Sequence, residues 1–301
     1  MNDVADRTLA GILLRLLSGI LFTGMMVCVK AASTAAVPLG QTVFFRSAFA
    51  LLPIVAFMVW RREFPRALAT RRPLGHLLRS GLGAAAMFAS FAAVARLPVA
   101  EATLLAQLAP VAMAVGGVLL LGERFSRHRA AALALVLGGV AALVVPDLGH
   151  ARADGRVLGY ALGILAALLT AGALVTVRRI SRTETPASIA FYFVLVTTLA
   201  GLATLPLGWV AVSGPTLGLL ILSGLFGGAA HICMTLALRF AEVSRLAPFE
   251  YVALIWPVLA DLLIFGLPLS GGFLVALPLV LGGAGLAALE GRRGLTRPLR
   301  Q

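Results

Sequence analysis

The chain has 301 residues, of which 60% are apolar and 12% are charged, and its mean hydropathy is +1.00. A soluble domain carries about 25% charged residues, so this composition excludes an ordinary soluble protein. The net charge of +13 suits nucleic-acid binding in principle. However, the basic residues stand in small groups between apolar runs, without interleaved aromatic residues, which excludes a nucleic-acid-binding face.

The apolar runs are rich in Leu, Ala and Gly and lack the alternating pattern of barrel strands. Because a backbone in hydrocarbon must satisfy its own hydrogen bonds, the runs predict transmembrane helices. We therefore expect an all-α integral membrane protein with ten transmembrane helices. In chain order, the expected spans are residues 10–31, 38–60, 75–95, 100–121, 129–146, 157–177, 187–210, 216–238, 246–266 and 270–290.

The distribution of Lys and Arg predicts how these spans are oriented. With the N-terminus in the cytoplasm, the inner connections hold 18 basic residues and the outer connections hold four. Short cytoplasmic loops are enriched in Lys and Arg. We therefore expect residues 1–9 and the basic tail 291–301 to be cytoplasmic, in a bacterial-type inner (plasma) membrane. Arg15 interrupts the first apolar run, which argues against a cleaved signal peptide. Cys28 and Cys233 fall within spans and are expected to be packing residues rather than a disulfide.

The two halves of the chain resemble each other. A shift of 144 residues aligns Leu137–Gly139 with Leu281–Gly283 and gives 12 identities over positions 99–139. The expected repeats are residues 10–146 and 157–290. Since each contains five spans, an odd number, the second repeat must cross the membrane in the opposite sense to the first. Inverted repeats are typical of transporters, whose substrate site lies near the membrane midplane between the repeats.

Several motifs point to one family. They are Arg46, the string Leu121-Gly122-Glu123, the glycine pairs of spans five and ten, and the Ala-Pro-Phe-Glu-Tyr string at 247–251. Their order and spacing resemble the ten-span EamA type of the drug/metabolite transporter (DMT) superfamily, over residues 10–290. The second half reads Phe-Gly-Leu-Pro at 265–268, where the family usually repeats Leu-Gly-Glu. In this respect the chain looks more like the YddG-type amino-acid exporters. The resemblance implies export of amino acids or related metabolites without a bound cofactor.

Ionisable residues within a span are costly and are therefore functional candidates. Glu250, Pro257 and Asp261 share one face of span nine. Pro257 removes a backbone hydrogen bond and is expected to kink the helix. The two carboxylates are expected about 16 Å apart along the axis, facing the central cavity as coupling or gating groups.

Three arginines fall within spans. Arg46 shares a face of span two with Thr42, and both are expected at the cavity. Arg46 has three open roles: a structural or gating ion pair with Asp261, contact with a substrate carboxylate, or snorkelling to the membrane surface. Arg15 and Arg79 lie near inner ends of their spans and are expected to snorkel or to neutralise the inner carboxylate of span nine.

Uncharged polar and aromatic side chains complete the expected cavity. Thr103 and Gln107 share a face of span four, and Tyr251 is the repeat equivalent of Gln107. The alternative role for Gln107 and Tyr251 is interhelical hydrogen bonding. His231 is a candidate substrate contact or proton carrier, with hydrogen-bonded packing as the alternative. An apolar lining, with ordinary packing as its alternative, is expected from Phe88, Phe91, Met234 and Trp256.

The predicted function is secondary export of amino acids or related small metabolites by alternating access, by a monomer. No Gly-x-x-x-x-Gly-Lys-Ser/Thr loop for ATP occurs. Proton coupling through Glu250 and Asp261 and simple facilitation both stay open. The alternative is another metabolite or a drug, nucleotide-like compounds included. A more remote alternative is an intramembrane enzyme, which the absence of Gly-x-Ser-x-Gly, of Gly-x-Gly-Asp and of clustered metal ligands disfavours. No metal or cofactor is expected.

Overall fold

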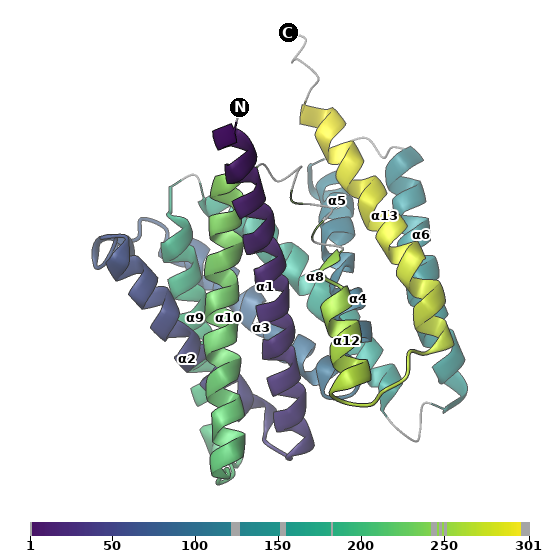
Figure 1. The fold of residues 1–301 in the computed structure, drawn as a ribbon, viewed down its shortest axis with the longest axis horizontal. Helices are drawn as coiled ribbons and strands as arrows, with labels where there is room; N and C mark the ends of the chain where they lie inside the picture. Colours follow the sequence, from purple (N-terminus) through teal and green to yellow (C-terminus); the bar gives the residue numbers. More distant parts are fainter. Residues whose placement is uncertain are drawn as a thin grey trace.

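The computed structural model describes residues 2–121, 127–150, 155–181, 183–241, 246, 249 and 252–295. Its described part is helical throughout, without a β-strand, and forms a bundle in which successive long helices run in opposite directions (Figure 1). The elements are α1 (Asn2–Thr34), α2 (Leu39–Trp60), η1 (Arg66–Leu68), α3 (Pro73–Val94), α4 (Val99–Ala106), α5 (Leu108–Leu121), α6 (Arg127–Val144), η2 (Val145–His150), α8 (Arg156–Ile180), α9 (Pro186–Leu202), η3 (Leu205–Leu207), α10 (Gly214–Phe240), α12 (Ile255–Leu263) and α13 (Gly271–Leu295).

The expectation of an all-α, multi-pass membrane protein is confirmed. Within the described residues, seven helices are long and apolar enough to cross a membrane, and two shorter apolar helices cover Val99–Met113 and Gly271–Leu286. The outer surface of the bundle carries large exposed apolar side chains, including Leu13, Leu52 and Leu168, each more than half exposed. An apolar surface of this extent is suited to lipid rather than to water.

Spans four and nine are broken helices, where the hydropathy pattern predicted continuous ones. Span four divides into α4 and α5 at Gln107. The backbone N–H of Gln107 donates to the carbonyl of Leu104, three residues earlier, in a tightened last turn of α4. In span nine, α12 begins at Ile255, directly after a turn at Ala253 and Leu254. Pro257 stands four residues after Ala253 and has no N–H to donate to the carbonyl of Ala253, which accepts from Trp256 instead. The interruption of span nine thus lies where the proline was expected to distort the helix, although it takes the form of a break rather than a kink in one continuous helix.

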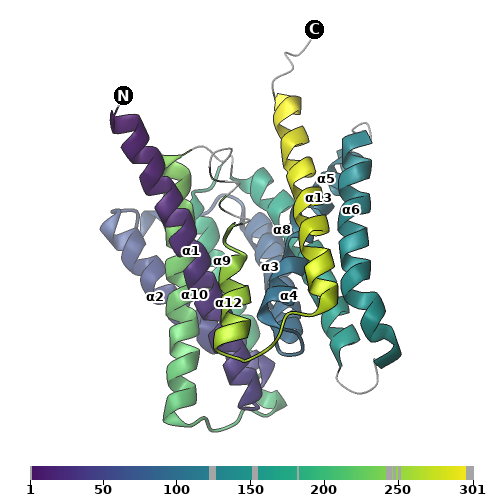
Figure 2. The same ribbon diagram turned by 45° about the vertical axis from the view of Figure 1, so that its right-hand side comes forward.

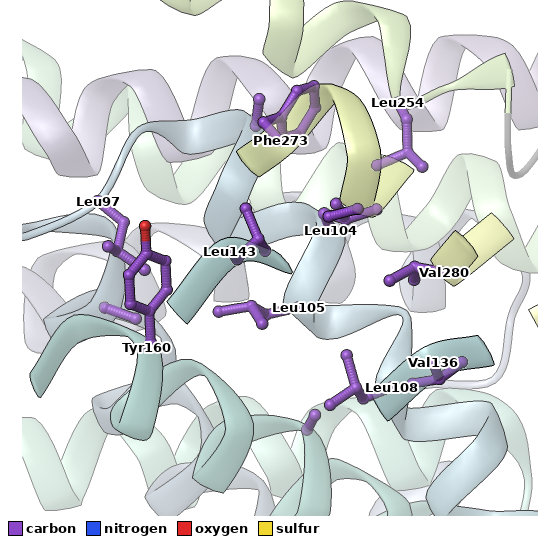
Figure 3. Packing of buried hydrophobic residues seen from close by; sticks show 14 of the residues in the cluster. Leu97, Leu104, Leu105, Leu108, Val136, Leu143, Tyr160, Leu254, Phe273 and Val280 are labelled. Carbon is purple, nitrogen blue, oxygen red and sulfur yellow. The ribbon is translucent and has the colours of Figure 1, made fainter. Parts of the chain in front are cut away.

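Two apolar cores hold the bundle together. One joins α4, α5, α6, α8 and α13, and Figure 3 shows its central side chains, with Tyr160 and Phe273 among the largest. The other joins α1, α2, α3 and α9. Turning the view shows α6 and α13 side by side at one edge of the molecule, with α1 and α10 paired on the opposite side (Figure 2).

Glycines allow α6 and α13 to approach closely. A Cβ atom at Gly139 would lie 2.6 Å from Val280 Cγ2, and a Cβ at Gly283 would lie 2.6 Å from Val136 Cγ2. Both separations are far below an ordinary contact, so any larger residue would force the helices apart. The contact is reciprocal, because each helix offers a glycine to a valine of its neighbour.

Candidate functional site

A cavity of about 480 Å³ lies between α1, α2, α3, α8, α9 and α10. Its walls are largely apolar, and they include Phe91 and Met234, which were both expected there. Ser181 and Pro186 also line it and are exposed, at the junction where α8 ends and α9 begins. The cavity therefore reaches the end of the bundle at which α1 begins and α13 ends (Figure 1).

Arg46 contributes a buried charge to this cavity, as expected from the sequence. Arg46 is only 2% exposed, and its Nε lies 3.3 Å from the sulfur of Met25. Its Nη1 is buried and has no hydrogen-bond partner. Snorkelling is excluded by this burial, so the guanidinium faces the cavity instead of the membrane surface.

Arg79 faces the same cavity, which contradicts its expected position at the membrane edge. Its Cζ lies 4.1 Å from the ring centroid of Phe193, within range of a cation–π interaction. Its Nε and Nη1 are buried without a hydrogen-bond partner. Sequence position alone placed Arg79 six residues from the start of its helix and gave no sign that the side chain turns inward.

His231 lines the same cavity and packs between two aromatic rings. Its ring centroid is 5.1 Å from that of Phe22 and 6.4 Å from that of Phe193, with edge-on geometry in both cases. Phe193 therefore contacts both His231 and Arg79.

Thr103 and Gln107 line a second, smaller cavity of about 210 Å³ at the breaks in spans four and nine. Met26 lines both this cavity and the larger one, so the two spaces adjoin. Thr42 lines a third cavity, of about 450 Å³, together with Arg96 near the opposite end of the bundle. Phe91 lines both the third cavity and the main one, so these two spaces adjoin as well. The structure thus places Thr103, Gln107 and Thr42 in spaces beside the main cavity rather than in its own lining.

Of four other expected residues, two are placed away from the main cavity and two lie outside the described residues. Phe88 packs against the core of α1, α2, α3 and α9. The indole of Trp256, on α12, packs near Gly19 and its N–H has no hydrogen-bond partner. Glu250 and Tyr251 lie outside the described residues.

Asp261 does not pair with Arg46. Its two carboxylate oxygens accept hydrogen bonds from the backbone amides of Val99, at 2.9 Å, and Ala100, at 2.7 Å. These amides belong to the first turn of α4, where unpaired N–H groups and the helix dipole favour a negative charge. Arg46 meets Met25 instead, so the ion-pair role expected for these two residues is wrong in this conformation.

A network of polar side chains closes the bundle at the end opposite the cavity mouth. Glu101, which is 2% exposed, accepts hydrogen bonds from Arg156, at 3.0 Å, and from Ser270, at 2.9 Å. The hydroxyl of Tyr160 lies 2.9 Å from Glu101 and 2.8 Å from Asp147, and it donates to one of them. Sequence analysis missed this network, although Glu101 is a carboxylate one residue inside a predicted span.

A second buried carboxylate joins two connections at the cavity-mouth end. Glu184 accepts hydrogen bonds of 3.0 Å from the hydroxyl of Thr70 and from the amide of Arg71, and it lies 3.2 Å from His76 Nε2. Burial alone would raise the pKa of Glu184, but the contact with His76 and the hydrogen bonds from Arg71 and Thr70 outweigh it and hold the pKa below its usual range. These contacts tie the connection between α2 and α3 to that between α8 and α9.

The site contains no recognisable metal centre in the part of the chain that the structure describes, because no three His, Cys, Asp or Glu side chains gather there. The polar groups of the main cavity are instead two guanidiniums, which only donate hydrogen bonds, and an imidazole and the hydroxyls of Ser90, Thr170, Ser181 and Thr235, which donate or accept them. Such a surface is suited to binding a small molecule that offers hydrogen-bond acceptors.

Comparison with known proteins identifies the family. The model of the EamA-like transporter family matches residues 9–145. The chain is 31% identical to the pseudopaline exporter CntI of Pseudomonas aeruginosa, over 84% of this chain and 87% of that one. It is 30% identical to a riboflavin transporter of Rhizobium johnstonii, over 92% and 90%. A solved crystal structure superimposes with a TM-score of 0.64 at 26% identity, and covers 96% of this chain and 99% of the other. The chain therefore belongs to the EamA family of the drug/metabolite transporter superfamily.

Proposed function

We propose that this small-molecule transporter exports amino acids or related small metabolites across a bacterial inner membrane, without ATP and by alternating access. The observation that carries this proposal is the cavity of about 480 Å³, which is lined by six helices and offers hydrogen-bond donors deep within the bundle. Its volume is within the range of pockets that bind small metabolites.

Alternating access needs one end of the path to be closed while the other is open. The main cavity reaches the end of the bundle formed by Ser181 and Pro186. At the other end, Glu101 and Asp261 each hold two helical segments together. The charge asymmetry of the connections supports a cytoplasmic position for both termini, and hence a cavity that faces the cytoplasm.

The mechanism we propose is a rocking motion between two inverted repeats, residues 10–146 and 157–290. Two features support this organisation. α1 packs extensively on α10, and α3 packs in the same way on α8, which are the pairings that a two-fold relation between the repeats requires. The reciprocal contact of Gly139 and Gly283 uses the same register, a shift of 144 residues, as the internal sequence similarity.

The substrate and the direction of transport are the finer parts of this proposal. Relatives are named as a pseudopaline exporter, a riboflavin transporter and, at 26% identity, an S-adenosylmethionine uptake transporter of Rickettsia prowazekii. This variety favours a second candidate function, transport of another small metabolite through the same cavity. Asp261 and Glu250 are the groups we propose for proton coupling or gating, since an ionisable residue in a span requires a role.

Counterflow in proteoliposomes tests the proposal. Vesicles that contain the purified chain and are preloaded with one unlabelled amino acid should accumulate the same labelled amino acid above protein-free vesicles. An imposed pH gradient should then alter uptake if protons are coupled. Accumulation of no amino acid, together with accumulation of another metabolite such as riboflavin, would replace the first candidate with the second. The absence of counterflow for every compound would contradict the transport function in both forms.

A further inference from the structure

Arg46 and Arg79 line one cavity without an acidic partner. None of the described residues that line this cavity is Asp or Glu, whereas Arg46, Arg79 and His231 all do. One nitrogen of Arg46 and two of Arg79 are buried and lack a hydrogen-bond acceptor. A buried cation costs free energy unless an acceptor or a counter-charge accompanies it. The pair of guanidiniums therefore favours a negatively charged occupant.

The packing around both arginines leaves space for the guanidinium groups. A Cβ atom at Gly227 would lie 3.0 Å from Nη2 of Arg46, and a Cβ at Gly83 would lie 3.1 Å from Nη1 of Arg79. Both separations are tighter than ordinary contacts, so a side chain at either glycine would press on the guanidinium. The ring of Phe193 holds Arg79 from another side. Each arginine is thus positioned by its neighbours.

The two arginines lie at different depths. Arg46 is seven residues from the start of α2 and Arg79 is six residues from the start of α3, and these 22-residue helices run in opposite directions. With the helix ends level and a rise of 1.5 Å per residue, their Cα atoms differ in depth by roughly 12 Å. The side chain of Arg79 extends along α3 toward Gly83, in the direction of Arg46, so the two guanidiniums are closer in depth than the Cα atoms. Each guanidinium can hold one carboxylate through two parallel hydrogen bonds. Apolar side chains of the lining, such as Met87 and Phe91, accompany these two polar anchors.

We propose that the substrate is an organic anion with two carboxylates joined by an apolar chain, one carboxylate at Arg46 and the other at Arg79. This inference rests on the proposed function, because it takes the cavity as the transport path. It narrows the substrate class from amino acids in general to acidic amino acids and dicarboxylates. His231 then contributes a hydrogen bond or a further positive charge beside the same ligand.

Calorimetric titration of the full chain in detergent tests two-point binding. The ligands are the unbranched dicarboxylates from malonate to suberate, with butyrate as a monocarboxylate and with glutamate against glutamine. The affinity should reach a maximum at one dicarboxylate length, and glutamate should bind more tightly than glutamine. Arg46→Gln and Arg79→Gln should each lower the best affinity about tenfold or more, because each removes a charge-assisted hydrogen-bond pair. Arg79→Lys, which keeps the charge but not the planar fork, should fall between Arg79→Gln and the wild type.

Arg178→Gln provides the matched control. Arg178 lies near the same end of the bundle but is exposed and does not line the cavity, so its removal should leave the affinities unchanged. A flat dependence on chain length in the wild type would overturn the proposal, and so would an unchanged affinity in Arg79→Gln. Either result, combined with counterflow of a neutral metabolite, would leave the proposed function standing. A length optimum without counterflow of any compound would instead support the anion site and contradict the transport function.

Discussion

Replacing Glu101 with alanine is expected to destabilise the folded protein by about 3 kcal/mol, because the removal of a buried carboxylate leaves its hydrogen-bond donors without that acceptor. Ser270 loses its acceptor, and Arg156 loses its contacts with Glu101 while it keeps its bonds of 2.8 Å to Asp147 and 2.7 Å to the hydroxyl of Tyr160. The network closes the end opposite the cavity mouth, so this variant should also open that end more often. A change of 1.4 kcal/mol in the balance between two conformations alters their ratio about tenfold.

Thermal unfolding in detergent measures the first effect and hydrogen exchange near α4 measures the second. Glu63→Gln is the control: its ion pair with Arg61 is 3.5 Å long, and both side chains are 33% exposed. An exposed pair of this kind contributes about 1 kcal/mol or less. If Glu101→Ala and Glu63→Gln unfold at the same temperature, the closing network does not have the role assigned to it.

Replacing Gly224 with valine is expected to destabilise the protein by about 3 kcal/mol or more, through overpacking between α2 and α10. A Cβ at this position would lie 2.5 Å from the Cβ of Phe49 and 2.8 Å from the carbonyl oxygen of Arg46. Because the second contact is with backbone, no change of side-chain rotamer relieves it. The helix that carries Arg46 must therefore shift, and substrate binding should weaken together with stability.

Gly218→Val is the matched control, since Gly218 lies on the same helix and no atom is found within 4 Å of its Cβ position. The two variants share the same change in intrinsic helix propensity. The difference between their unfolding temperatures therefore isolates the contact between α2 and α10. Equal unfolding temperatures would contradict this close packing.

The sequence predicted the helical, membrane-spanning class because hydropathy is a local property and lipid permits few kinds of backbone structure. Hydropathy alone does not predict the breaks in spans four and nine, because their residues are as apolar as those of continuous helices. Pro110 and Pro257 stand four residues after Ala106 and Ala253, where the regular helical bonding ends, and each removes the backbone hydrogen bond that would continue the helix. Pro257 therefore marked the break in span nine, whereas the same signal from Pro110 in span four was not used.

Some residues of the candidate site could be predicted from the sequence and others could not. Arg46 and His231 were found from the sequence because polar residues deep within apolar runs are conspicuous. Arg79 and Glu101 lie near the ends of their predicted spans, where a charge is unremarkable. Their importance follows from the direction of the side chain, which neighbours such as Phe193 and Tyr160 determine. No pattern within one helix contains that information.

The most direct test of the whole account is the accessibility of a cysteine at Ser90, which lines the cavity. Ser90→Cys, in a background without Cys28 and Cys233, would be treated with a membrane-impermeant maleimide in inside-out and in right-side-out vesicles. The account predicts labelling in the inside-out vesicles only, and labelling in both kinds once Glu101→Ala is added. Equal labelling in both kinds of vesicle before that change, or no effect of Glu101→Ala, would contradict it.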